Sequence, residues 1–128
     1  MCGIAGIIYK NGPSESITSR IQGMSHAMAH RGPDGEGFFF SDGTTEKSYF
    51  GARAPEITDV PYVPTAHVSD HSSASHLAFA HRRLSIIELS SLGHQPMCDA
   101  TVRYWITFNG EVYNYLELKQ ELTTLGHR

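Results

Sequence analysis

The first third of the chain carries two apolar patterns with different periods. Residues 3–9 form a short, Ile-rich apolar run bounded by a turn signal, which predicts a buried strand. After Ser14 the apolar residues recur every three or four positions, so we expect a helix over residues 15–29 with Ser14 as its N-cap. Pro33 cannot continue that helix. The apolar stripe expected to face a sheet consists of Ile17, Ile21, Met24 and Met28.

The middle of the chain combines strand patterns with a long polar segment. Strands are expected at 36–41 and 46–51, and residues 76–89 are apolar enough for one or two more short strands. Residues 52–75 carry three prolines and show no steady period, so they predict a long surface excursion.

The last quarter predicts one strand and one helix. Apolar residues alternate over 102–108, which predicts a strand that ends at Asn109. A helix is expected from Asn114, with Glu117 completing a capping box and Gly126 as its stop. Its apolar face consists of Tyr115, Leu118, Leu122 and Leu125. The order of elements predicts an α+β protein with mainly antiparallel sheets.

Composition narrows the class of protein. With 128 residues, of which 40% are hydrophobic, the chain suits one domain with a sizeable core. The net charge of −3 and the scattered Lys and Arg give no basic stripe, so we expect no nucleic-acid partner. No apolar run is long enough to cross a membrane, and the N-terminus lacks the basic start of a signal peptide. We therefore expect a soluble, cytoplasmic protein.

Cys2 directly follows the initiator methionine. Removal of Met1 leaves a thiol and an α-amine on one residue, and the amine, with a pKa near ~8, can accept the thiol proton at neutral pH. This arrangement predicts an N-terminal nucleophile that needs no separate histidine. The alternative is a small apolar residue at the start of the first strand, and Cys98, in a stretch without other chemistry, is expected to be structural.

Asn109 and Gly110 follow the predicted strand 102–108 and can supply donors to an oxyanion. The Asn side-chain amide is one donor and the Gly backbone N–H is the other, at a position where a substrate must approach the main chain closely. A two-residue hairpin turn is the alternative. The helix expected from Asn114, in place of a returning strand, weakens that alternative.

Arg83 and Glu111 suit the two charged groups of an amino-acid substrate. A guanidinium binds an α-carboxylate through two parallel hydrogen bonds, and Arg83 lies where a strand would hold it. The Glu111 carboxylate can pair with an α-ammonium. Taken singly, each residue has the alternative of a solvated surface charge.

Eight histidines invite the hypothesis of a metal site. His26 and His30 stand four residues apart, as do His67 and His71, but neither pair has a third ligand nearby. The chain also lacks a His-Glu-x-x-His pattern. We expect no metal ligands.

Four segments occur in an order that resembles a known family: residues 2–6 (Cys-Gly-Ile-Ala-Gly), 31–35 (Arg-Gly-Pro-Asp-Gly), 81–87 (His-Arg-Arg-Leu-Ser-Ile-Ile) and 109–114 (Asn-Gly-Glu-Val-Tyr-Asn). Together they resemble the N-terminal glutaminase domain of glutamine-hydrolysing asparagine synthetases, which are class II glutamine amidotransferases. The resemblance implies a glutamine amidotransferase type-2 domain over residues 2–128. It also implies the N-terminal-nucleophile hydrolase fold, a four-layer αββα sandwich of mainly antiparallel sheets.

The same resemblance implies a role for each candidate residue. Cys2 attacks the side-chain amide of L-glutamine, its amine is the general base, and Asn109 and Gly110 form the oxyanion hole. Arg83 binds the α-carboxylate, and Glu111 helps to hold the α-ammonium. The implied pocket lining is Leu84, Ser85, Ile86 and Ile87, with Arg31 as a brace beside the nucleophile.

The resemblance further implies parts that lie outside these residues. The family has another Asp, beyond residue 128, that shares the ammonium, and a C-terminal synthetase domain that uses ATP and Mg²⁺ to convert aspartate to asparagine. We therefore expect an incomplete domain, truncated at its C-terminus, with no cofactor of its own and with the synthetase domain as its partner. A homodimer is left open. Two alternatives also stay open: an asparagine-synthetase-like amidotransferase acting on another acceptor, for example in sugar or polysaccharide biosynthesis, and an inactive glutaminase-like interaction domain.

Overall fold

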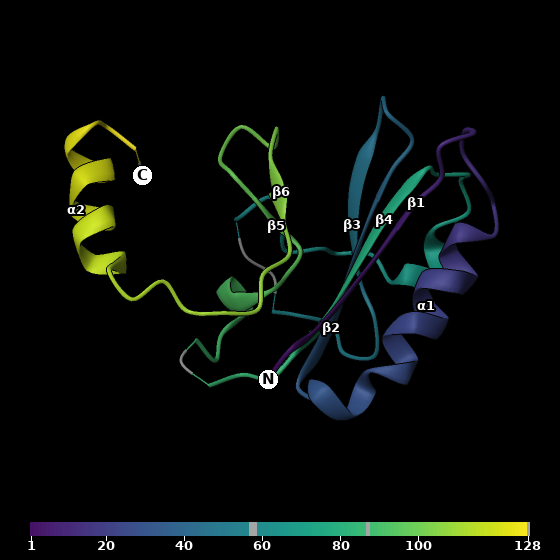
Figure 1. The fold of residues 1–128 in the computed structure, drawn as a ribbon, viewed down its shortest axis with the longest axis horizontal. Coiled ribbons are helices and arrows are strands. Elements are labelled where there is room, and N and C mark those ends of the chain that lie inside the picture. The colour runs from purple at the N-terminus through teal and green to yellow at the C-terminus, as the bar shows by residue number, and fades with distance from the viewer. Residues whose placement is uncertain (57–58, 87, 128) are drawn as a thin grey trace.

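The computed structural model describes residues 1–56, 59–86 and 88–127, and a four-stranded antiparallel sheet lies at its centre (Figure 1). The sheet has the order β1-β4-β2-β3, so β4 lies between β1 and β2. The strands are β1 (Gly3–Ile8), β2 (Gly35–Ser41), β3 (Glu46–Phe50), β4 (Leu77–Arg83), β5 (Met97–Cys98) and β6 (Trp105–Ile106), the last two forming a separate ribbon. The helices are α1 (Ile17–Ala27) and α2 (Tyr115–Thr124), with 3-10 turns at Ala29–Arg31, Val68–Asp70 and Ser91–Gly93.

The strands predicted near 3–9, 36–41 and 46–51 are confirmed, and β4 falls inside the apolar segment 76–89. β2 and β3 form a hairpin because the Asp42 carboxylate closes its turn. That carboxylate accepts hydrogen bonds from the backbone N–H groups of Thr44 and Thr45, both within 2.8 Å.

Both faces of β2 are covered, which explains its three consecutive buried phenylalanines at 38–40. Phe38 and Phe40 belong to the core cluster that α1 covers. Phe39 faces the other side, where its ring centroid lies 5.7 Å from that of Phe79 and 4.5 Å from that of Trp105. α1 thus covers one face of the sheet, and the segment around Trp105 partly covers the other.

α1 is shorter than the predicted helix 15–29, and its cap differs from the prediction. Ser16, not Ser14, is the N-cap, and it makes no side-chain capping bond. Ser14 is drawn away because it forms an isolated antiparallel bridge with Ser75. The helix ends at Ala27, and a 3-10 turn continues the chain to the residues before Pro33.

The buried stripe of α1 also differs from the expected one at Met24, which is 42% exposed. Ser25 is fully buried instead, because it forms hydrogen bonds to residues of the sheet. Its carbonyl accepts a hydrogen bond from Arg82 Nε at 3.1 Å, and its hydroxyl donates to Glu36 at 2.5 Å. Arg82 and Glu36 form an ion pair at 3.5 Å, so a polar link between helix and sheet replaces part of the predicted apolar contact.

The described parts of the 52–75 excursion contain no strand, in agreement with the prediction. The excursion does not lie wholly on the surface, however. Val63 and Val68 are buried, and Val68 joins the core cluster.

The predicted strand 102–108 is reduced to the two residues of β6. Val102 has a φ of 58°, which no strand residue adopts. The cause is the Asp99 carboxylate, whose Oδ1 accepts backbone N–H groups of Arg103 and Tyr104 at 2.9 Å and folds the segment into a turn. Hydrogen bonds to the Asp99 side chain therefore favour a turn, although the alternating pattern predicts a strand.

α2 forms where the sequence predicts it, and it ends as predicted. Gly126 has a φ of 88°, and the N–H of His127 donates to the carbonyl of Leu122 at 2.9 Å, as in a Schellman stop. The capping box is wrong, since Asn114 makes no side-chain capping bond. The apolar residues of α2 are all exposed, and the helix stands away from the central sheet (Figure 1).

These elements make an α+β protein with antiparallel sheets, as predicted. The four-layer sandwich and the C-terminal truncation stay predictions. Within the described ranges, no helix combines the length and the apolar character needed to cross a membrane.

Candidate active site

Strand pairing brings the N-terminus to the end of β4. Gly3 pairs with Arg82 in antiparallel register, so Cys2 lies beside the residues that follow Arg82. The Leu84 N–H donates a hydrogen bond to Cys2 Sγ at 3.3 Å, and the same sulfur lies 3.7 Å from the Leu84 carbonyl oxygen. The half-buried thiol therefore lies against the backbone of Leu84, the residue that follows Arg83 in the chain.

Residues 31–35 form hydrogen bonds both to Cys2 and to the residues at the end of β4. Arg31 Nε donates to the Cys2 carbonyl at 3.2 Å. Asp34 donates its backbone N–H to the Arg83 carbonyl at 3.0 Å, and its Oδ2 accepts the Ser85 N–H at 2.8 Å. Gly32 permits the close approach, because a Cβ there would overlap the backbone between Arg82 and Arg83.

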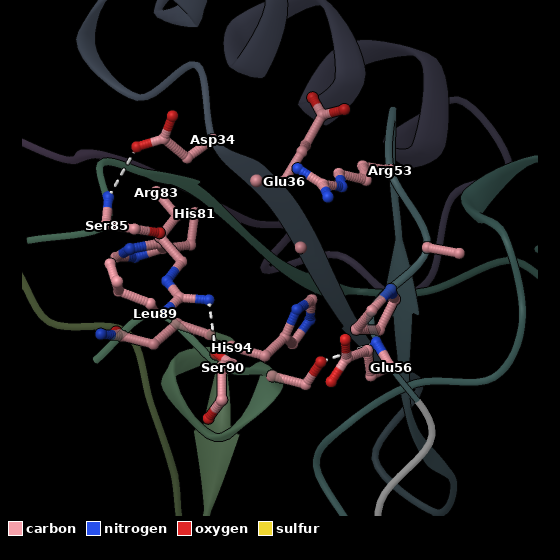
Figure 2. Close-up of a pocket in the computed structure, with 16 residues that line it drawn as sticks. Asp34, Glu36, Arg53, Glu56, His81, Arg83, Ser85, Leu89, Ser90 and His94 are labelled. Carbon is pink, nitrogen blue, oxygen red and sulfur yellow. Dashed lines mark hydrogen bonds between the residues drawn. The ribbon is translucent and has the colours of Figure 1, made fainter.

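A cavity of about 380 Å³ opens next to these residues (Figure 2). Arg83 and Ser85 line it, whereas Cys2 does not. Its walls carry both signs of charge: the guanidinium groups belong to Arg53 and Arg83, and the carboxylates to Asp34 and Glu56, whereas the Glu36 carboxylate is bonded to Ser25 and Arg82 on the α1 side. A polar cavity of this composition suits a small zwitterion.

The Arg83 guanidinium is held by neutral acceptors. Its Nη1 donates to the Ser90 carbonyl at 2.9 Å, and its Nη2 donates to the Glu88 carbonyl (Figure 2). Across the described ranges, the one ion pair is that of Arg82 with Glu36, so the Arg83 charge is not cancelled by a carboxylate. It remains available to an anionic ligand.

Two buried histidines, His81 and His94, also line the cavity. Burial is the main cause that lowers the pKa of each imidazole to about 4; the nearby Arg83 charge contributes to both shifts, and His81 contributes to that of His94. Both are therefore neutral at pH 7. His81 Nδ1 lies 3.0 Å from Thr107 Oγ1, and His94 Nε2 has no hydrogen-bond partner among the described residues.

The structure brings only part of the predicted site together. Cys2, Arg31, Arg83, Leu84 and Ser85 form one cluster. In the described part of the chain, Asn109, Gly110 and Glu111 are exposed and make no hydrogen bond to that cluster.

The segment that carries Asn109 nevertheless begins at the cavity. Thr107 contacts His81, and the Phe108 N–H donates to Gln95 Oε1 at 2.6 Å. Ile86, predicted in the pocket lining, is 74% exposed, and Ile87 lies outside the described residues.

Sequence reasoning assigned no role to several residues at this site. Asp34 and His81 lie inside segments that the resemblance had marked, so their position in sequence was an available signal. Arg53, Glu88, Ser90 and His94 reach the site through loops, and no spacing rule places loop residues.

Comparison with known proteins agrees with these features. The profile of the glutamine amidotransferase domain matches residues 1–53 and 66–128, and the unmatched residues lie within the 52–75 excursion. No solved structure matches the chain significantly.

Three relatives illustrate the similarity. Over 99% of this chain, it is 31% identical to asparagine synthetase [glutamine-hydrolyzing] 1 of Bacillus subtilis. It is 33% identical over 94% of the chain to a putative asparagine synthetase 2 of Methanocaldococcus jannaschii, and 34% identical over 97% to one of Mycobacterium tuberculosis. The chain spans 15%, 20% and 16% of the length of these curated relatives. With nearly all of it matched by the domain profile, the chain belongs to the glutamine amidotransferase domain family.

Proposed function

We propose that this chain hydrolyses L-glutamine to glutamate and ammonia through a thioester on Cys2. The Cys2 thiolate adds to the side-chain amide carbon of glutamine, and the tetrahedral intermediate collapses with loss of ammonia, which leaves a γ-glutamyl thioester. Water then adds to the thioester carbon, and the C–S bond breaks to release glutamate and restore the thiol.

The observation that carries this proposal is the contact between Cys2 Sγ and the Leu84 N–H, directly beside Arg83. A nucleophile for the amide and a cation for the α-carboxylate thus lie at one end of β4. The adjoining cavity has a size and charge pattern suited to an amino acid.

The base in this mechanism is the α-amine of Cys2 itself, so Met1 must be removed. Met1 is 76% exposed, which makes it accessible to an aminopeptidase. The freed amine accepts the thiol proton and later passes it to the departing nitrogen.

We assign the oxyanion donors to the Asn109 side chain and the Gly110 N–H, and the ammonium partner to Glu111. These residues follow Thr107, which His81 holds at the cavity, so the segment that carries them is anchored close to the substrate. The contribution expected from such donors is about 3 kcal/mol of transition-state stabilisation.

The fate of the ammonia follows from the relatives, which are named as glutamine-hydrolysing asparagine synthetases. We propose that it aminates aspartate in an ATP-dependent synthetase domain. ATP and Mg²⁺ would act in that domain. Within the described residues no three His, Cys, Asp or Glu side chains are grouped to hold a metal ion, so we assign no step of this chain to Mg²⁺. A cytoplasmic location and a homodimer stay predictions.

The test is ammonia release from L-glutamine by the full-length protein, after mass spectrometry has shown that Met1 is absent. We expect Cys2→Ala to abolish release and Cys98→Ala, which changes the other thiol, to leave it intact. A processed wild-type protein without activity, or an active Cys2→Ala variant, would refute the proposal. Formation of asparagine from aspartate and ATP then separates aspartate from other acceptors.

A further inference from the structure

Residues 88–93 follow the pocket lining predicted at 84–87. Hydrogen bonds to the Glu88 carboxylate fix the turn that these residues form. Glu88 Oε1 accepts the Ser90 backbone N–H at 2.8 Å and the Ser90 hydroxyl at 2.6 Å. The Ser90 Oγ in turn accepts the Leu92 N–H at 3.2 Å and caps the 3-10 turn Ser91–Gly93. These bonds, with a smaller contribution from the nearby Arg83 charge, hold the pKa of Glu88 below its usual range, so the carboxylate is ionised at neutral pH.

This fold presents two carbonyl oxygens to the Arg83 guanidinium, those of Glu88 and Ser90. A guanidinium has five N–H groups, of which these contacts occupy two. Because the acceptors are neutral, they fix the orientation of the guanidinium without cancelling its charge. A direct ion pair with Glu88 would have occupied Arg83, but the Glu88 carboxylate bonds Ser90 instead.

Gly93 shows how closely the turn fits the guanidinium. A Cβ on Gly93 would overlap Nη2 and Cζ of Arg83 and would lie 3.1 Å from Glu88 Cγ. The turn 88–93 therefore packs closely against one side of the Arg83 guanidinium.

We propose that Glu88 is a positioning residue that sets the affinity for the α-carboxylate of glutamine by orienting Arg83 through the turn 88–93. This inference rests on the proposed glutaminase function. It assigns Glu88 no contact with the substrate, and it predicts an effect confined to the carboxylate end of the substrate.

The experiment compares L-glutamine with 4-aminobutanamide, which is glutamine without its α-carboxylate. We expect Glu88→Ala to raise the KM for glutamine about tenfold with little change in kcat, since it loosens a charge-assisted contact away from the reacting amide. Its kcat/KM for 4-aminobutanamide should stay within about twofold of wild type, since no carboxylate is present to be bound. Glu88→Gln, which keeps the acceptor oxygen, should restore most of the preference for glutamine.

A double-mutant cycle tests the route through Arg83. In an Arg83→Ala background, Glu88→Ala should have no additional effect on glutamine. Glu15→Ala, at an exposed glutamate far from the turn in sequence, is the control. The inference is overturned by an unchanged glutamine KM, by an equal loss on both substrates, or by additive losses in the cycle. A wild-type protein that releases no ammonia would instead overturn the proposed function, and this inference with it.

Discussion

At the scale of single residues, the positive charges that line the cavity belong to arginines, whereas the two histidines in its lining are neutral at pH 7. Among the described residues, the Arg83 guanidinium donates hydrogen bonds to carbonyl oxygens alone, whereas Arg82, its neighbour in β4, is paired with Glu36. His81 and His94 are neutral because burial disfavours the imidazolium and Arg83 repels it. A carboxylate entering the cavity therefore meets the charge of Arg83 in a fixed position.

The lowered histidine pKa values predict a loss of stability in acid. The unfolded chain binds protons at these histidines below about pH 6.5, whereas the folded chain binds them only near pH 4. The free energy of unfolding should thus fall as the pH drops from about 6.5 to about 4, by an amount on the order of 2 kcal/mol for each histidine. Urea denaturation across this range measures the slope.

His94→Gln should flatten that dependence, because it removes one of the buried histidines whose pKa is lowered. His30→Gln, at an exposed histidine, is the matched control and should leave the slope as it is. An equal slope in wild type and His94→Gln would contradict the assignment.

At the scale of elements, β4 connects the core to the cavity. It lies between β1 and β2, and its two faces point to α1 and to the cavity. Its side chains alternate, so Arg82 points to α1 while His81 and Arg83 line the cavity. The pairing of β1 with β4 places the N-terminus beside Arg82, at the C-terminal end of β4. One strand therefore supplies Arg82 to a buried ion pair with β2 and Arg83 to the cavity.

The packing of α1 on this sheet predicts unequal costs for two truncations within the expected apolar stripe. Ile21 is fully buried, so Ile21→Ala should lower the free energy of unfolding by about 3 kcal/mol through lost contacts and a cavity. Met24→Ala removes a half-exposed side chain and should cost less than about 1 kcal/mol. Chemical denaturation of both variants measures the difference, and equal losses would contradict the observed face of α1.

At the scale of the whole molecule, the chain divides into a packed sheet and an exposed C-terminal segment (Figure 1). Residues 109–127 are exposed throughout, and the apolar side chains of α2 lie on the surface. The proposed oxyanion donors sit at the start of this segment.

Native-state hydrogen exchange should reproduce the division. Amides of β4 are bonded to strands on both sides and should exchange through global unfolding, whereas those of α2 should exchange through local opening. Protection factors at least about a hundredfold higher in β4 than in α2 are expected, since the two openings differ by a few kcal/mol. Comparable protection in both elements would contradict this arrangement of the chain.

The sequence by itself determined the strands at 3–9, 36–41 and 46–51, the two helices, and the family, because these depend on local periodicity and on side chains at fixed positions in the chain. It also led to the proposal that Cys2 is the nucleophile and its own amine the base. The tertiary structure decided the rest. Strand register set Cys2 beside Leu84, and a buried ion pair put Ser25 in place of Met24.

Local hydrogen bonding and loop geometry account for the remaining differences. The Asp99 carboxylate converted an alternating pattern into a turn, which shortened the predicted strand 102–108 to β6. Loops brought Glu88 and His94 to Arg83, at separations that no period encodes. The position of Cys2 in the sequence was thus enough to propose it as a nucleophile, whereas the residues proposed to orient Arg83 come together only through contacts in the tertiary structure.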